Sequence, residues 1–322
     1  MYYDISGVKA YSEMMKDKYK NRKDTENVFP EGITDAEFRK AIIDIFCGVD
    51  WYISYPGSQT QVNEEAIEYI LLHIGDGLTL ESIASHLNMS VSNFCRQFKK
   101  QTGQSVYSFI KKLKLEQSAM RLKMEKGRSI TDIGEDYGYS ASNFSTAFSQ
   151  IYNLSPTEFR EKVHITTKEA DRIYQELNEK IRIEERPEYL VTYERSIGNY
   201  SELKVAWCKF IEKYKSYATK AIFFERTFDD PSITDKDKCI FDICMSIENK
   251  TGFPNTCTIS GGKYAVYPFK GYLNEIYALN QQIVGIWFPK SNYTIDERYS
   301  YDQYHLVRED GYMEFDICLP IK

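Results

Sequence analysis

The sequence repeats itself at an offset of 50 residues, and this repeat constrains the fold more than any other feature. From Leu80 onwards, residues of the same type recur in the same order 50 positions later. The matching pairs are Leu80 and Ile130, Ile83 and Ile133, Ser90 and Ser140, Asn93 and Asn143, Phe94 and Phe144, Phe98 and Phe148, and Phe109 and Phe159. A repeat of this kind indicates two copies of one structural unit.

Each copy has the pattern of a short helix, a tight turn and a second helix. In the first copy, the apolar positions within residues 80–87 have the spacing of the buried face of a helix. After a break, Ser90 and Ser140 are natural N-caps for the second helix. Gly103 and Asn153 are typical of the helix end that follows, because both tolerate a left-handed backbone. The repeat therefore predicts two helix-turn-helix units.

Residues 105–124 join the two copies and have apolar side chains at helical spacing. They predict one helix near 30 Å long, which would hold the two units about one DNA turn apart. The whole chain has a net charge of −6, which excludes a uniformly basic surface. Residues 90–128, however, hold 10 basic and only 2 acidic side chains. This local basic surface favours DNA binding over the alternative, a plain helical bundle with repeated packing.

These residues resemble the AraC/XylS family of transcription regulators. The motifs that carry the resemblance are Ser90-x-Ser92-Asn93-Phe94-xx-Gln97-Phe98-Lys99-Lys100, Ser142-Asn143-Phe144-xxx-Phe148, and Leu154-Ser155-Pro156-xx-Phe159-Arg160. The resemblance implies an all-α double helix-turn-helix domain over residues 62–163. The candidate DNA-binding residues are Ser90, Ser92, Asn93, Cys95, Arg96, Lys99 and Lys100 in the first unit, and Ser142, Asn143 and Thr146 in the second.

The two units differ in charge. Arg96, Lys99 and Lys100 of the first unit correspond to Thr146, Ser149 and Gln150 of the second. We therefore expect the first unit to supply most of the affinity and of the direct base contacts. Arg96 is a candidate for a bidentate contact to guanine, and the alternative for this residue is an ordinary phosphate contact.

The C-terminal part, residues 187–322, contains a second repeat. An offset of 74 residues pairs Phe241-Asp242-Ile243-Cys244 with Phe315-Asp316-Ile317-Cys318. Each half has the pattern of a strand, a helix and two strands. This pattern predicts a pseudo-two-fold α+β domain with an antiparallel sheet on one side and helices on the other. Residues 164–186 would be a helical or loose linker to this domain.

The C-terminal part resembles the GyrI-like effector-binding domain, which is fused to AraC-type units in regulators of the Rob type. The motifs are Gly261-Gly262-Lys263-Tyr264-Ala265-Val266, Trp287-Phe288-Pro289-Lys290-Ser291-Asn292-Tyr293 and Tyr301-Asp302-Gln303-Tyr304. The resemblance implies a small, lipophilic or cationic effector bound between two halves, with aromatic walls and one acid. The candidate effector-binding residues are Trp287, Tyr301, Asp302 and Tyr304.

Aromatic faces around a carboxylate suit a cation, which agrees with this implication. The alternative is that the strand tyrosines only cover the sheet and that Asp302 is simply exposed. Asp302 stands where the family usually has Glu, one methylene longer, so the charge preference of the site stays open at this point.

The remaining features exclude several other classes of function. The start of the chain has neither a basic nor an apolar segment of a signal peptide, and the longest apolar stretch, residues 41–49, is too short for a membrane. The seven cysteines follow no CxxC spacing, and the four histidines are scattered. We therefore expect a cytoplasmic protein without a metal or cofactor. In residues 1–61, a helix over 35–47 and an aromatic extended piece over 50–56 predict a packing extension or an oligomer contact.

Together these features predict a transcription regulator that binds double-stranded DNA and a small-molecule effector, with RNA polymerase as a candidate further partner. Two alternatives remain. In the first, the protein binds DNA, but the C-terminal domain is a ligand sponge or a protein-contact module. In the second, Asp302 and Tyr304 form the acid–tyrosine pair of a hydrolase. No activated nucleophile or base accompanies that pair, so we expect no enzymatic activity.

Overall fold

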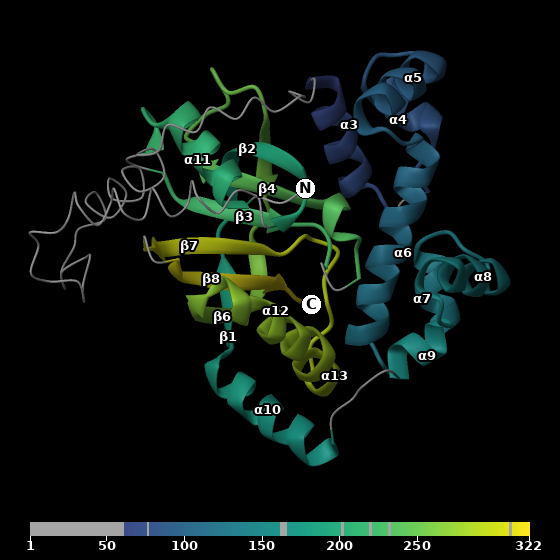
Figure 1. Ribbon diagram of the computed structural model, residues 1–322, viewed down its shortest axis with the longest axis vertical. Coiled ribbons are helices and arrows are strands. Elements are labelled where there is room, and N and C mark those ends of the chain that lie inside the picture. The colour runs from purple at the N-terminus through teal and green to yellow at the C-terminus, as the bar shows by residue number, and fades with distance from the viewer. Residues whose placement is uncertain are drawn as a thin grey trace, which may run out of the picture.

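The computed structural model describes residues 61–75, 77–161, 166–200, 203–218, 221–230, 233–308 and 311–322. A helical region lies beside a curled antiparallel sheet with helices of its own (Figure 1). Within these ranges, no helix is both long enough and apolar enough to cross a membrane. The helix predicted over 35–47 and the extended piece over 50–56 lie outside the described residues.

The helical region has the order that the 50-residue repeat predicts. Its helices are α3 (Gln61–Leu72), α4 (Leu80–His86), α5 (Val91–Thr102), α6 (Val106–Met124), α7 (Ile130–Asp136), α8 (Ala141–Tyr152) and α9 (Pro156–Glu161). Ser90 caps α5, because its side chain accepts a hydrogen bond from the Asn93 amide. Gly103 and Asn153 end α5 and α8 in the left-handed conformation, with φ of 75° and 54°. These three predicted caps are thus confirmed, whereas Ser140 stands at the N-cap position of α8 without a side-chain cap hydrogen bond.

Each helix-turn-helix unit has its own buried core. Phe94 and Phe98 fill the core of the first unit and meet edge to face, with ring centroids 5.7 Å apart. Phe144 and Phe148 fill that of the second in the same way, at 5.5 Å. The helix α6 runs between the units as one continuous rod (Figure 1), and α3 packs on the first unit.

The sheet has eight strands in its described part, all antiparallel, in the order β1-β6-β8-β7-β3-β4-β2-β5. Their bounds are β1 Arg182–Arg186, β2 Tyr189–Gly198, β3 Phe223–Thr227, β4 Cys239–Ser246, β5 Thr256–Ile259, β6 Gly262–Tyr272, β7 Tyr301–Val307 and β8 Tyr312–Pro320. From the middle outwards, the order is β7-β8-β6 on one side and β3-β4-β2 on the other. This order agrees with strand, helix and two strands in each half, while the two-fold relation of the halves stays a prediction.

The sheet is curled, and the ladders β1–β6 and β2–β5 lie at its opposite ends. The two ladders share one register, because Arg186 pairs with Gly262 and Tyr189 pairs with Ile259. Where the two long ribbons bend, Gly261 faces the turn at Pro187. A Cβ on Gly261 would lie 2.8 Å from the Glu188 amide nitrogen, so only glycine fits at this crossing.

Helices cover the outer face of the sheet (Figure 1). They are α10 (Thr167–Lys180), α11 (Leu203–Tyr214), α12 (Leu273–Gln282), a π-helical turn at Ile283–Trp287 and the short α13 (Phe288–Lys290). In α10, Ile173 and Leu177 pack into the same core as α11 and α12. The predicted linker is therefore helical, and its last residues form β1 of the sheet.

Candidate DNA interface and ligand cavity

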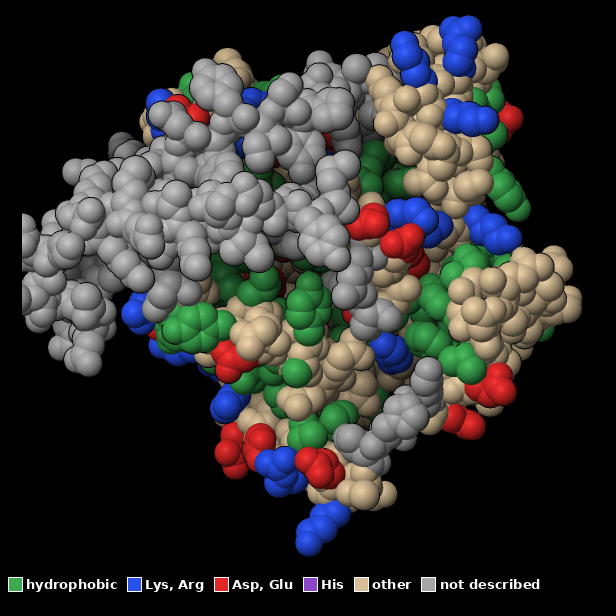
Figure 2. Space-filling view, viewed as in Figure 1, with side chains coloured by type: hydrophobic (Ala, Val, Ile, Leu, Met, Phe, Trp, Pro, Cys, Tyr) green, Lys and Arg blue, Asp and Glu red, His purple; other side chains and the backbone are tan. Residues whose placement is uncertain are grey.

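The recognition helix α5 of the first unit presents a basic surface. Ser90, Ser92, Arg96, Lys99 and Lys100 are exposed. Figure 2 shows basic side chains over α5 and the first turns of α6. Lys99 and Lys100 lie in the last turn of α5, where cations also favour the helix dipole.

Two further candidates on α5, Asn93 and Cys95, are half-buried. The Asn93 side-chain oxygen accepts hydrogen bonds from Arg96 Nη2 at 2.9 Å and from Gln97 Nε2 at 3.3 Å. Asn93 thus holds the Arg96 guanidinium along the exposed face of the helix. Such a pair can approach the edges of two bases together.

The recognition helix α8 of the second unit has no charged side chain. Ser142, Asn143 and Thr146 are exposed, and the surface over α8 is uncharged in Figure 2. The Thr146 hydroxyl donates to the Ser142 carbonyl at 2.9 Å, so its proton is already used within the helix. The two units therefore present matching backbones with different chemistry.

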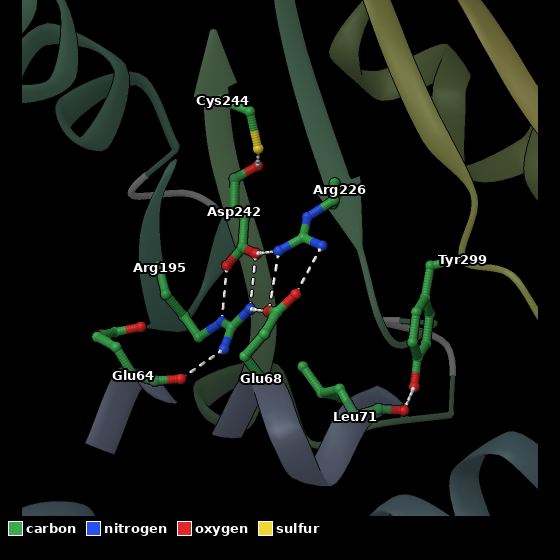
Figure 3. A network of polar contacts seen from close by, with 8 residues as sticks. All are labelled: Glu64, Glu68, Leu71, Arg195, Arg226, Asp242, Cys244 and Tyr299. Atoms are coloured by element: carbon green, nitrogen blue, oxygen red, sulfur yellow. Dashed lines mark hydrogen bonds and ion pairs between the residues drawn. The ribbon is translucent and has the colours of Figure 1, made fainter. Parts of the chain in front are cut away.

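Buried ion pairs join α3 to the sheet (Figure 3). Asp242 accepts from Arg195 Nε at 2.7 Å and from Arg226 Nη2 at 2.5 Å. Glu68 of α3 accepts from Arg195 Nη2 at 2.6 Å and from both terminal nitrogens of Arg226, at 3.0 and 3.1 Å. We call these four residues the ion network. The rings of Tyr193 and Phe228 each lie 5.1–5.2 Å from both guanidinium carbons.

The pKa values of two acids of α3, Glu64 and Glu68, are shifted in opposite directions. Burial alone would raise the pKa of Glu68, but the charges of Arg226 and Arg195 outweigh it and lower that pKa to about 2. Burial raises the pKa of the neighbouring Glu64 to about 8, and the charge of Arg195 offsets this only in part. One oxygen of Glu64 is buried and has no hydrogen-bond partner among the described residues.

Tyr299 forms a second link between the sheet domain and the helices. Its hydroxyl donates to the Leu71 carbonyl of α3 at 2.8 Å (Figure 3) and accepts from Gln117 Nε2 of α6 at 2.8 Å. Its ring packs edge to face on Phe228, with centroids 4.8 Å apart. Phe228 and Tyr299 thus connect the ion network to the wall of the cavity described next.

A cavity of about 200 Å³ lies between α6 and the sheet domain. Its α6 wall consists of Gln117, Met120, Arg121 and Met124, which lie in the second half of that helix, and Tyr137 adds a contact from the second unit. The facing walls come from β3, β7, β8 and α12. A ligand in this cavity would touch the sheet domain and the rod between the two units at the same time.

The predicted effector residues divide between two faces of the sheet. Asp302 and Tyr304 alternate along β7 and both line the cavity. Tyr301 points the other way and packs inside the curled sheet, with Tyr264 at a ring distance of 5.3 Å. Trp287 is fully buried against Phe288 and donates to Asn178, so it supports the core. Neither Tyr301 nor Trp287 belongs to the cavity lining.

Glu225 of β3 is a cavity residue that the sequence reasoning missed. It is 3% exposed and pairs directly with Asp302 across the two central strands. Burial raises the pKa of Glu225 to about 7, and burial together with the charge of Glu225 raises the pKa of Asp302 well above its ordinary value. The signal was present as a carboxylate directly after the apolar residues 221–224, within a predicted strand. Among the described residues, no group of three or more His, Cys, Asp or Glu could hold a metal ion.

Three family models match the chain. A helix-turn-helix domain model matches residues 83–162, and a model of the GyrI-like small molecule binding domain matches residues 179–322. A model of the type II Thoeris inhibitor Tad8 matches residues 11–73. The first two matches coincide with the helical region and the sheet domain. Most of the third lies outside the described residues.

Curated relatives match the helix-turn-helix region. The regulatory protein PocR of Salmonella typhimurium is 31% identical over 102 residues, which are 31% of this chain and 33% of PocR. The transcriptional activator RhaS of Escherichia coli is 33% identical over 90 residues, which are 28% of this chain and 32% of RhaS. The chain thus covers about a third of the length of these relatives.

Solved structures are similar over the same region or beyond it. The C-terminal domain of AraT from Geobacillus stearothermophilus is 31% identical, with a TM-score of 0.32, over 34% of this chain and 93% of that one. EcmrR in a DNA complex is 14% identical, with a TM-score of 0.37, over 76% of this chain and 98% of that one. On the family models and the curated relatives, the chain carries an AraC-type helix-turn-helix domain followed by a GyrI-like domain, and its matched relatives are AraC-family regulators.

Proposed function

We propose that the protein is a transcription regulator that binds a specific DNA site through α5 and α8 and binds a small effector in the cavity beside α6. One observation carries this proposal: the cavity takes its walls both from the GyrI-like domain and from the helix that spaces the two recognition helices. The contacts of a bound molecule can therefore differ between two placements of α6 relative to the sheet. Effector control of DNA binding requires such a difference.

The contacts to DNA would be unequal. Arg96, Lys99 and Lys100 give α5 the phosphate contacts that dominate affinity, and Arg96 beside Asn93 can contact base edges. The uncharged α8 would contribute contacts through Ser142 and Asn143. Because one chain carries both recognition helices, a monomer can occupy a whole site.

The effector would be a lipophilic cation. The carboxyl groups of Glu225 and Asp302 supply negative potential, and Tyr304, Phe228 and Tyr277 supply aromatic surface around them. The Tyr304 hydroxyl donates to Glu225 at 2.9 Å rather than to Asp302. The predicted pair of Asp302 and Tyr304 is therefore not joined by this hydrogen bond, and we propose a binding role for both. We further propose a cytoplasmic location and RNA polymerase as a partner on DNA.

Effector binding would act on the second unit. The ion network fixes α3 and the first unit to the sheet, whereas the cavity touches the second half of α6 and Tyr137 of the second unit. A ligand that fills the cavity would therefore change the placement of α8 relative to α5. Binding of DNA and of the effector must then affect each other by the same factor.

Fluorescence anisotropy with promoter DNA, with and without a panel of lipophilic cations, tests this proposal. We expect binding at low ionic strength and at least one compound that changes the affinity for DNA. Asp302→Asn should weaken that change without altering DNA affinity in the absence of compound. Failure to bind duplex DNA, or DNA affinity that no compound changes, would remove the regulator assignment.

The match of residues 11–73 to the Tad8 model favours a second candidate function, inhibition of a type II Thoeris system. In this case the ligand cavity would act as a sponge and DNA affinity would not respond to the ligand. Co-expression with a type II Thoeris system tests it. If the protein abolishes the activity of that system, and the Arg96→Ala variant does so equally well, the result would support inhibition that is independent of DNA binding.

A further inference from the structure

We propose that the cavity selects cations with N–H donors, such as amidinium, guanidinium or protonated amines, over quaternary cations of similar size, and that Glu225 shares this recognition with Asp302. The inference rests on the proposed effector-binding role of the cavity. It narrows the effector from any lipophilic cation to one that donates hydrogen bonds.

The two carboxyl groups are placed to flank one ligand group. Glu225 and Asp302 are direct partners in the antiparallel ladder between β3 and β7, so their side chains leave the same face of the sheet. Directly opposed residues have Cβ atoms about 4.5–5.5 Å apart. Both side chains line the cavity, opposite α12 and α6. A planar cation with N–H groups on two edges can meet both carboxyls from one position.

The protein itself supplies no cation to this pair. Within the described ranges, no Lys or Arg forms an ion pair with Glu225 or Asp302; Glu225 accepts hydrogen bonds only from Tyr304 and Trp207. The two basic side chains that line the cavity are engaged elsewhere. Arg121 contacts Glu125 and Asp136, and Arg298 donates to the Gly261 carbonyl and to Asp296.

The groups that face the pair from neighbouring elements are acids and phenols. Asp229 follows β3, Tyr200 precedes α11 and Tyr277 lies on α12, and each contributes negative or neutral character. Burial raises the pKa of Glu225 to about 7 and that of Asp302 well above its ordinary value, so both carboxyls hold protons more readily than exposed ones do. A cation that enters competes with protons for this pair.

An N–H cation replaces both the charge and the hydrogen bonds of the protons that it displaces. A quaternary ammonium supplies charge but no donor, so the buried carboxylate oxygens would lose hydrogen bonds without replacement. The cavity is large enough for a single-ring ligand, because an apolar cavity of about 150 Å³ already holds benzene. The difference between the two cation types should therefore be measurable with small aromatic probes.

Isothermal titration calorimetry of the full chain with benzamidinium and phenyltrimethylammonium tests the inference. Each probe has one ring and one positive charge. We expect benzamidinium to bind at least about 10-fold more tightly, the effect of one charge-assisted hydrogen bond. Titrations at pH 7 in two buffers of different ionisation enthalpy should show that about one proton is released as benzamidinium binds.

The variant Glu225→Gln keeps the shape of the side chain and should reduce the preference to within about 3-fold. The control is Glu297→Gln, which removes an acid at the cavity rim whose side chain is 78% exposed and should leave the preference unchanged. Circular dichroism confirms that both variants fold.

Equal affinities of the two probes, an unchanged preference in Glu225→Gln, or no binding of benzamidinium at millimolar concentration would each overturn the inference. These outcomes can be distinguished from a failure of the proposed function. A quaternary compound that changes DNA affinity would preserve the regulator and remove only the donor requirement.

Discussion

The two helix-turn-helix units share a sequence pattern and differ in what surrounds them. The core of the first unit includes Phe228 and Ile240 of the sheet domain, and the ion network adds buried charge pairs at the same contact. The core of the second unit is largely its own, and Ile233 is its described apolar contact from the sheet domain. The first recognition helix is basic, whereas the second is neutral.

This difference teaches that the buried ion pairs and the basic recognition helix fall on the same unit. The second unit, whose recognition helix is uncharged, follows the far end of α6. Under the proposed function, the first unit would hold the protein on DNA while the second is repositioned. The repeat alone would not separate these roles, because the separation depends on residues outside it.

The ion network provides the largest expected effect. Glu68→Gln should lower the free energy of unfolding by about 3–5 kcal/mol, because it leaves buried guanidinium charge without its partner. The contact of the second unit with the sheet domain is weaker, since Lys123 and Asp230 lie 3.8 Å apart. Asp230→Asn should cost less than Glu68→Gln, because the Asn side chain keeps an oxygen that can accept from Gln281 Nε2. Urea unfolding measures both.

Glu65→Gln is the control for Glu68→Gln, because Glu65 is on the same helix but its side chain is 53% exposed. Equal losses in the two α3 variants would mean that the network does not anchor the first unit.

The pH dependence of this anchor follows from Glu64, whose pKa is raised from 4.5 to about 8. Stability linked to a raised acid pKa is present below pH 4.5 and is lost as the pH rises to 8. Glu68, Glu194, Asp242 and Arg195 surround this group. Between pH 5 and pH 8.5 the chain should lose on the order of 2–4 kcal/mol through Glu64.

The measurement is urea unfolding at both pH values for the natural protein and for Glu64→Gln. Other acids titrate over the same window, so the informative quantity is the difference between the two proteins. Identical pH profiles would show that Glu64 ionises as freely in the folded state as in the unfolded one.

DNA contacts should follow the charge difference. Arg96→Ala should lower the free energy of binding to cognate DNA by about 1–3 kcal/mol and that to scrambled DNA by less, as expected for a base contact. Thr146→Ala should change affinity by less than about 0.5 kcal/mol, because its hydroxyl is already bonded to the Ser142 carbonyl. Anisotropy on both DNAs measures this. An equal loss on both for Arg96 would reduce it to a phosphate contact, and a larger effect of Thr146 would reverse the comparison.

A modest effect on stability concerns the position where the repeat has Ala84 in one unit and Gly134 in the other. A Cβ on Gly134 would lie 2.9 Å from Phe144 Cγ, so Gly134→Ala must displace the ring. The gain of about 1 kcal/mol in helix propensity should not offset this, and we expect a net loss of about 1 kcal/mol. Gly127→Ala, with nothing within 4 Å of the new Cβ, is the control in thermal unfolding. A stabilised Gly134→Ala would mean that the second unit repacks freely.

Local structure was largely predictable from the sequence. Caps such as Ser90 and Gly103, the paired Phe residues and most strands follow from periodicity and from turn chemistry. The alternation along β7 also predicts that Tyr301 lies on the opposite face from Asp302 and Tyr304, since neighbours in a strand face opposite sides. The resemblance grouped all three, whereas the strand period places only the last two together.

The rest depends on contacts between distant segments. Glu68 meets Arg195 and Arg226 across more than 120 residues of chain, and no local pattern encodes such a partner. The cavity likewise forms only when α6 packs against the sheet domain. The position of Glu225 in the cavity wall can therefore be recognised only in the folded structure. The strand β1 was hidden in a polar segment because it pairs at the edge, where charged side chains reach water.

Tyr299 places a single phenolic oxygen at the meeting point of three elements. That oxygen gives its proton to the end of α3 and receives one from the middle of α6, while its ring forms part of the cavity wall. Under the proposed function, a molecule that displaces the whole Tyr299 side chain would break both hydrogen bonds together, and α3 and α6 would lose their common support. Filling a small cavity would thereby change how two helices are held.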